Sequence, residues 1–277
     1  MQQPGKPYSR GPEILRMLYN HGPMSIRGLN RIIPGPMDYR RIAEALARLR
    51  ERGFVVRRFD SLPDNVGHFY QISHRQDIRE DLARVVGVGA DQLRAPQIRD
   101  QELHHSQECA IWAEGFKRMY PGVKVLRDFQ IARDEEARYK LLISEHKPDL
   151  IPDVLVFFPK EDGKKRVVIA VEIERSRKAN DRVTEKLWRI TTKTMLDGVL
   201  YDCSYDSIAT AYKHLYNSRV RENFLRVNDR KNYLMFGRHD HLLFNCNGER
   251  TDLRSWIGYL LSTSTRERQD THFPPSA

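Results

Sequence analysis

The first 75 residues place hydrophobic side chains at helical spacing and then in two short β-prone runs. Ile14, Leu15 and Leu18 mark the first helix, and Ser25 and Asp38 are suited to cap the second and third. Turn-rich residues separate the two β-prone runs, as in a hairpin. The pattern therefore predicts three short helices and then two strands, over residues 13–21, 26–33, 39–52, 54–59 and 68–72.

Helices and strands alternate in the larger remainder of the chain, which follows a connector at residues 76–100. Their order predicts an α/β (α+β) domain with a mixed sheet over residues 101–261. Residues 262–277 are polar, hold two prolines and have no apolar period, so we expect a disordered tail. The expected helices cover residues 103–119, 182–196, 207–216 and 253–261, and the expected strands cover 124–132, 149–158, 166–174, 198–203, 233–236 and 241–245.

The net charge of the chain is positive and unevenly distributed. The 277 residues hold 47 Lys and Arg against 37 Asp and Glu, a net charge of +10. Residues 1–75 hold 13 of the basic and 6 of the acidic residues, so this quarter of the chain carries +7. Concentrated positive charge favours a polyanionic partner, nucleic acid first, and a charge that only serves solubility is the alternative.

Cysteine content and hydropathy favour the cytoplasm. The three cysteines are far apart and odd in number, so they predict neither a disulfide framework nor a zinc site. No apolar run approaches the roughly 18 residues of a membrane span, and residues 1–10 lack the apolar core of a secretion signal. We therefore expect a cytoplasmic protein without a membrane partner.

Three carboxylates lie at the ends of two apolar, β-prone runs in the second domain. Asp162-Gly163 lies between the runs, and Asp-Gly is a strong signal for a two-residue hairpin turn. Such a turn pairs residues whose numbers sum to 325, which places Asp153 opposite Glu172. Glu174 shares that face two residues further on. The sequence thus predicts three acids at the open end of one hairpin, and a longer turn would shift the pairing.

Carboxylates held this close repel one another unless a cation lies between them. Hard oxygen ligands suit Mg²⁺ (or Mn²⁺), and a bound divalent ion can activate water and neutralise charge on a phosphodiester. Asp153, Glu172 and Glu174 are therefore the candidate catalytic residues. The alternative is an edge hairpin whose acids face solvent and pair with Arg175 or Arg177.

Basic side chains of the third helix and the following strand form a candidate DNA-binding face. Arg41, Arg48 and Arg52 are spaced so that they share one side of the helix. Arg40 and Arg41 lie in its first turn, where recognition helices contact bases. A solvated basic face with a local Glu44–Arg48 pair, or a protein-interaction module, is the alternative. The candidate DNA-binding residues are Arg40, Arg41, Arg48, Arg52, Arg57 and Arg58, with Lys186 and Lys193 on the helix after Glu174.

The order of elements over residues 11–75 resembles a winged helix-turn-helix domain. Pro152-Asp153 and Glu172-Ile173-Glu174, on a helix–three strands–helix–strand order, resemble the PD-(D/E)xK nuclease superfamily. This resemblance covers about residues 100–250. It implies that Asp153 and Glu172 are metal ligands and that an acid of the preceding helix joins them. Glu108 is the nearest match for that acid and Glu114 the second, and for either a solvent-facing position is the alternative.

The last residue of the superfamily's motif is usually a Lys that helps to orient water, and this chain has Glu174 there. Some restriction endonucleases carry Glu at this place and cut DNA. Lys178, Lys186 and Lys193 are candidates for a displaced ammonium group, and the sequence does not choose among them.

A basic winged helix before such a domain, with Glu172-Ile-Glu-Arg-Ser176, is similar to the replication-relaxation family of plasmid mobilisation accessory proteins. The resemblance implies a Mg²⁺-dependent DNA-processing protein of a mobile element, acting at or near a transfer or replication origin beside a relaxase. It would make the chain a metal-dependent DNA endonuclease, and a homodimer is compatible with it. The alternative is a non-catalytic DNA-binding accessory or regulatory protein, whose degenerate nuclease fold docks a relaxase or another partner.

Overall fold

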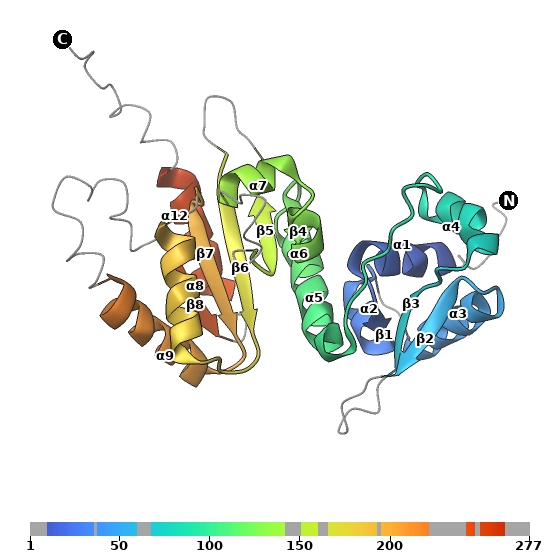
Figure 1. Ribbon diagram of the computed structural model, residues 1–277, viewed down its shortest axis with the longest axis horizontal. Helices are drawn as coiled ribbons and strands as arrows, with labels where there is room; N and C mark the ends of the chain where they lie inside the picture. The colour runs from blue at the N-terminus through green and yellow to red at the C-terminus, as the bar shows by residue number, and fades with distance from the viewer. Residues whose placement is uncertain are drawn as a thin grey trace, which may run out of the picture. The chain divides into compact units, whose positions relative to one another are not determined.

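The computed structural model has a mixed α/β architecture and divides into two compact units, Met1–Phe116 and Lys117–Ala277 (Figure 1). Among the described residues, no helix combines the length and the apolar character that a membrane crossing needs. The structure describes residues 10–35, 38–59, 68–141, 151–159, 166–192, 195–221, 242–246 and 250–263.

The first unit combines helices with a small antiparallel sheet of strand order β1-β3-β2. Its hydrophobic core includes Ile14, Leu18 and Leu46, all of which are buried. The unit extends beyond residue 100, because it takes in most of α5. Its elements are α1 (Gly11–His21), β1 (Met24–Ser25), α2 (Ile26–Ile32), α3 (Tyr39–Glu51), β2 (Val55–Phe59), β3 (His68–Ile72), η1 (Gln76–Ile78), α4 (Arg79–Val86), η2 (Asp100–Glu102) and α5 (Leu103–Met119).

Two helix starts in this unit are confirmed as the sequence predicted them. The Gly28 N–H donates to Ser25 Oγ at 3.1 Å, and the Arg40 N–H donates to Asp38 Oδ1 at 3.1 Å. Each bond satisfies an N–H that the first helical turn leaves without a partner. Gln107 of α5 adds a long-range contact, because its Oε1 accepts from the Ser25 N–H at 2.9 Å and the Ser25 hydroxyl at 2.8 Å.

The second unit is built on a five-stranded sheet of order β4-β5-β6-β7-β8. Strand β5 runs antiparallel to both β4 and β6, and β7 and β8 continue the sheet parallel to β6. Its elements after α5 are β4 (Lys124–Arg127), α6 (Asp128–Ile131), α7 (Glu135–Leu141), β5 (Val154–Phe157), β6 (Val168–Glu174), α8 (Asn180–Thr192), β7 (Gly198–Cys203), α9 (Asp206–Leu215), the π-helical segment η4 (Tyr216–Arg221), β8 (Leu242–Cys246) and α12 (Arg250–Thr263).

Helices pack on the two faces of this sheet. Alternate strand residues such as Ala170 and Tyr201 belong to a core cluster with Val183 and Leu187 of α8 and with α9. At Gly198 a side chain would collide with Trp256 and Leu260 of α12, so glycine permits a close approach there.

The pairing of β5 with β6 follows the predicted register. Val154 pairs with Val171 and Phe157 with Val168, and in each pair the residue numbers sum to 325. The turn Asp162-Gly163 that predicted this register lies outside the described residues.

The expected strand over residues 124–132 is correct only for its first half. β4 ends at Arg127, and residues 128–131 form the short helix α6. The Gln130 side chain explains the change, because its Oε1 accepts from the Arg127 N–H at 2.9 Å and closes a helical turn. Ile131 is still buried in the core, which is why the alternation resembled a strand.

Helix α7 was not expected, and some expected elements cannot be located. α7 buries only Ala137 and Leu141, too few positions for a helical period to be recognised. The predicted strand at residues 233–236 and residues 264–277 of the predicted tail lie outside the described part of the chain. Helix 103–119 and strand 198–203 match the structure at both ends.

Candidate functional site

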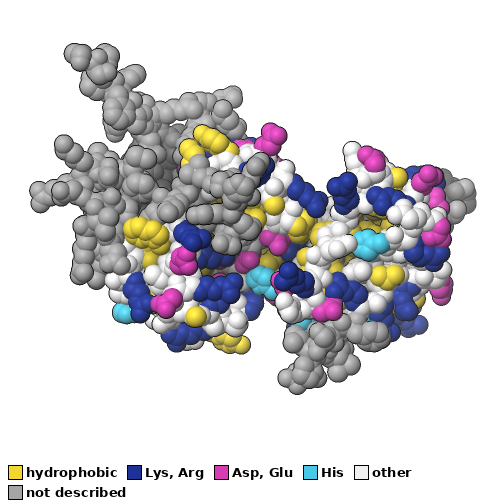
Figure 2. All heavy atoms as spheres, viewed as in Figure 1, with side chains coloured by type: hydrophobic (Ala, Val, Ile, Leu, Met, Phe, Trp, Pro, Cys, Tyr) yellow, Lys and Arg dark blue, Asp and Glu magenta, His cyan; other side chains and the backbone are white. Residues whose placement is uncertain are grey.

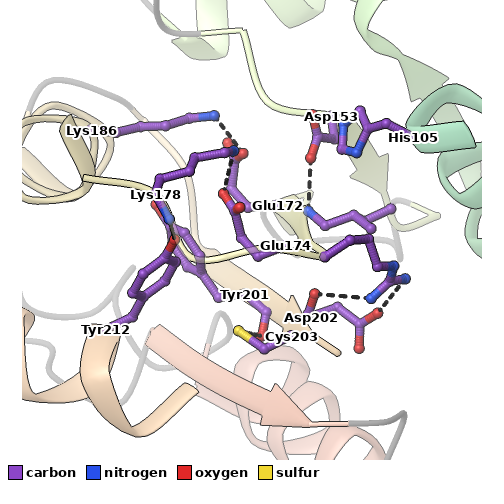
Figure 3. Close-up of polar contacts among 12 residues, drawn as sticks. His105, Asp153, Glu172, Glu174, Lys178, Lys186, Tyr201, Asp202, Cys203 and Tyr212 are labelled. Atoms are coloured by element: carbon purple, nitrogen blue, oxygen red, sulfur yellow. Dashed lines mark hydrogen bonds and ion pairs between the residues drawn. The ribbon is translucent and has the colours of Figure 1, made fainter. Parts of the chain in front are cut away.

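Three acids from the β5–β6 pair come together at the carboxyl end of β6 (Figure 3). Asp153 immediately precedes β5, and its Oδ2 accepts a hydrogen bond from the Ile173 N–H at 2.7 Å. Glu172 and Glu174 lie at the end of β6, and alternation places them on the same face as Ala170. The hairpin thus joins acids that are about 20 residues apart in sequence, as its register requires.

Both glutamates are buried, and each forms an ion pair with a lysine. Glu172 is 0% exposed and Glu174 is 2% exposed. Lys186 Nζ of α8 lies 2.5 Å from Glu172 Oε2, and Lys178 Nζ, in the loop before α8, lies 2.6 Å from Glu174 Oε1. Burying a carboxylate is costly unless a cation and hydrogen bonds accompany it, so the two lysines are part of the site.

Burial dominates the protonation of Glu172. Removal from water raises the pKa of this carboxyl to about 7, with Asp153 and Glu174 adding repulsion and Lys186 partly opposing the rise. The pKa of Lys186 is raised because Glu172 and the neighbouring acids outweigh its own desolvation. Glu172 Oε1 is buried and has no hydrogen-bond partner among the described residues. This oxygen is therefore available to a ligand.

Two tyrosines support the acidic site from β7 and α9. Tyr201 pairs in register with Glu172 and is almost fully buried. Burial, reinforced by Glu172 and Glu174, raises the pKa of Tyr201 well above its usual value, so its hydroxyl stays protonated. Tyr212 Oη accepts from the Lys178 N–H at 3.1 Å, which fixes the loop that carries Lys178.

Arg175 joins the ends of β6 and β7. Its guanidinium donates to Asp202 Oδ2 at 3.2 Å and to Ser204 Oγ at 3.2 Å. The Ser204 N–H donates to the Glu174 carbonyl at 2.9 Å. The loops that leave the two strands are therefore held together directly beside the acids.

The structure assigns local partners to the helix acids proposed as further metal ligands. Glu108 lies on α5, 4.0 Å from Arg31, in the first unit. Glu114, the second choice, lies 3.0 Å from Nε2 of the buried His21. The role of Glu108 as a ligand stays a prediction.

The basic residues of α3 are exposed on the first unit, as a DNA-binding face requires (Figure 2). Glu44 lies between two of them, 3.1 Å from Arg40 and 3.8 Å from Arg48. The expected Glu44–Arg48 pair is therefore present, and Glu44 also pairs with Arg40. The Arg41 side chain has no ion-pair partner among the described residues. Arg52 stacks on Phe54, with its guanidinium carbon 4.4 Å from the ring centroid.

Among the remaining candidate DNA-binding residues, the two arginines of β2 and Lys186 already contact other groups of the protein. Arg58 donates to the Ile98 carbonyl at 2.8 Å and pairs with Asp100, and Arg57 contacts His68. Lys186 is directed at Glu172. Lys193 lies outside the described residues.

The sequence does contain a signal that Lys186 belongs to the site, although a count of charges does not reveal it. It lies three residues after Val183 and four before Ile190, both of which are buried, so it occupies the apolar stripe of α8. The Glu174–Lys178 spacing of four is a weaker signal. Nothing local marks Asp202 or Tyr201, whose roles depend on the pairing of β6 with β7.

Comparisons with known proteins found no match among protein-family models, curated proteins or solved structures. The function of the acidic site is therefore inferred from its own geometry and chemistry.

Proposed function

We propose that the chain is a DNA-binding protein that processes DNA with a divalent metal ion at Asp153 and Glu172. The carrying observation is Glu172, which is completely buried at the end of β6, beside Asp153, with one oxygen lacking a hydrogen-bond partner among the described residues. A buried acid held beside other acids is a costly arrangement of the kind that is found preferentially at functional sites.

The donor set fits Mg²⁺ or Mn²⁺. Asp153 and Glu172 offer hard carboxylate oxygens, which these ions prefer, and the orphan Oε1 of Glu172 is the kind of atom that a ligand satisfies. A bound ion would lower the pKa of water and neutralise charge on a phosphodiester. Lys186 favours the ionised form of Glu172 and can donate to a water or phosphate oxygen, a role that the PD-(D/E)xK resemblance gives to the Lys missing at Glu174.

The strand order supports the same proposal. Helix α5, most of which belongs to the first unit, is followed by β4, by the inserted helices α6 and α7, and then by β5, β6, α8 and β7. Apart from the two inserted helices, this is the order of the nuclease-like core that the sequence suggested. In the first unit, three helices followed by a β-hairpin are the order of a winged helix-turn-helix. On the replication-relaxation resemblance, we also propose an origin of transfer or replication as the DNA and a relaxase as a partner.

A nicking assay tests catalysis. Supercoiled DNA is incubated with Mg²⁺ or Mn²⁺ and either the wild-type protein, Asp153→Ala/Glu172→Ala, or Glu185→Ala as a control. Glu185 lies on α8 with its side chain 60% exposed, so its loss should leave nicking unchanged. We expect nicking that requires the metal and is lost only in the double variant. Equal nicking by all three proteins would contradict the proposal.

The salt dependence of DNA affinity tests the role of α3. Each phosphate contact contributes about 0.9 to the log–log slope. Arg41→Ala with Arg48→Ala should therefore lower the slope by roughly two. An unchanged slope would place the DNA-binding surface elsewhere.

A second candidate function, a non-catalytic DNA-binding accessory protein, is favoured by the ion pairs themselves. Lys186 and Lys178 already neutralise Glu172 and Glu174 without a metal. In that case the acidic site serves as a structural core, and calorimetry would detect no Mn²⁺ binding that depends on Asp153.

A further inference from the structure

The ends of β6 and β7 form an ordered surface beside the acids. The Ser204 N–H donates to the Glu174 carbonyl at 2.9 Å, and Arg175 donates to Ser204 Oγ at 3.2 Å. The carbonyl of the next residue, Tyr205, accepts from Ile208 at 3.0 Å and so starts α9. We call Arg175, Arg177, Ser204 and Tyr205, together with Arg182 in the first turn of α8, the strand-end surface. Its backbone is fixed on both sides by the sheet and by α9.

Tyr205 projects from this surface into solvent. Its exposure is 62%, although residues around it in β7 and α9, such as Cys203 and Ile208, are buried. An aromatic ring held by a fixed backbone and left uncovered is a poor contribution to stability, because apolar area remains in water. Such a ring is well suited to stack on another flat group.

The charge around Tyr205 favours an anionic ligand. The loop and helix start at residues 175–182 carry Arg175, Arg177, Lys178 and Arg182 with the acid Asp181, and the exposed Asp206 follows Tyr205 directly. Arg175 pairs with Asp202 and Lys178 with Glu174, which leaves Arg177 and Arg182 as the cations of this loop without an ion-pair partner among the described residues. Arg177 and Arg182 are exposed, and Asp181 is paired with Arg219 at 3.1 Å. Lys and Arg side chains are visible over this end of the unit in Figure 2.

We infer that the strand-end surface binds single-stranded DNA, with an unpaired base stacked on Tyr205 and the backbone phosphates held by Arg177 and Arg182. Stacking on aromatic side chains combined with cationic contacts to the backbone is the general chemistry of single-strand binding. In a duplex both faces of each base are covered by its neighbours, so Tyr205 has no base face to contact. The inference rests on the proposed function for the class of ligand, and it specifies that the strand reaching Asp153 and Glu172 is unpaired.

Photo-crosslinking tests the contact directly. A single-stranded oligonucleotide carrying 5-iododeoxyuridine is irradiated with the full-length protein, and the crosslinked peptide is identified by mass spectrometry. We expect the crosslink at Tyr205, and not with the same sequence in a duplex. A crosslink that forms equally in the duplex, or that avoids residues 203–209, would overturn the inference.

Tyr139 provides a matched control. It is also 62% exposed, but it lies on α7, whose residue Lys140 accepts from the Met195 N–H near the start of β7, at the opposite end of that strand from Tyr205. Tyr205→Ala should reduce the yield of single-strand crosslinking to its peptide and weaken affinity roughly 5- to 150-fold, the range that stacking of one base supports. Tyr205→Phe and Tyr139→Ala should retain it, and an equal loss in Tyr139→Ala would contradict the assignment.

These binding readouts separate the inference from the proposed catalysis. Asp153→Ala/Glu172→Ala should crosslink at Tyr205 as the wild-type protein does. If that variant and the wild-type protein both fail to nick DNA while the Tyr205 crosslink persists, the catalytic proposal fails and the single-strand site stands. If the wild-type protein nicks DNA but no crosslink forms near Tyr205, the single-strand site is refuted and the catalytic proposal stands.

Discussion

Replacing Glu172 with Gln should change how the stability of the protein depends on pH. In the folded chain burial raises the pKa of Glu172 to about 7, against an ordinary value of 4.5. The folded state therefore holds this proton more tightly than the unfolded state does. By linkage, the free energy of unfolding falls as pH rises from about 4.5 to about 7, and it is highest on the acidic side of that window.

The size of the effect follows from the same pKa values. One pKa unit corresponds to about 1.4 kcal/mol, so the full shift corresponds to roughly 3 kcal/mol. Between pH 5 and pH 7.5 most of this range is crossed, and Glu172 should lower the free energy of unfolding by roughly 2 kcal/mol. Gln has no proton to lose, so Glu172→Gln should lack this part of the slope even if the variant is less stable at every pH.

Urea unfolding followed by circular dichroism at pH 5, 6, 7 and 7.5 measures the slope. The quantity to compare is the difference between wild-type protein and Glu172→Gln at each pH, which cancels the titration of other groups. Glu185→Gln is the control, because that side chain is 60% exposed and stays hydrated in both states. If the difference in free energy of unfolding between wild type and Glu172→Gln does not vary with pH, the claim that burial raises the pKa of Glu172 is refuted.

Three further predictions concern the supports of the site and of α3. Asp153→Asn should leave the melting temperature nearly unchanged, because an amide oxygen can still accept from the Ile173 N–H, but isothermal titration should show at least tenfold weaker Mn²⁺ binding. Tyr212→Phe removes the acceptor for the Lys178 N–H and should cost about 1 kcal/mol, with faster hydrogen exchange at that amide; unchanged exchange would contradict the contact. Asp38→Ala should lower the free energy of unfolding by about 1 kcal/mol in a denaturant titration, as expected for the loss of an N-cap.

The sequence predicted the elements whose signals are local. Ser25 and Asp38 cap helices through bonds to residues two and three positions away, so their roles can be read from the chain. The signal for the register of β5 with β6 is also local, because the place of Asp162-Gly163 between the two apolar runs is enough to predict it. This register is sufficient to predict that Asp153 lies close to Glu172.

Interactions between distant segments could not be predicted in this way. Lys186 and Glu172 are 14 residues apart, and their contact depends on how α8 packs across the sheet. Asp202 reaches Arg175 only because β7 lies parallel to β6. In residues 128–131 a side-chain bond from Gln130 decided between strand and helix, and hydrophobic alternation carries no information about such a bond.

The contact between Gln107 and Ser25 determines where the chain can be cut for study. Ala110 of the same helix is 0% exposed and belongs to the core of the first unit. A recombinant fragment that stops at residue 100 would lack α5. It would expose apolar surface and would leave the Ser25 amide without its acceptor. Failure of such a fragment to bind DNA would report aggregation, whereas a fragment that continues through Phe116 keeps the unit whole and gives α3 a fair test.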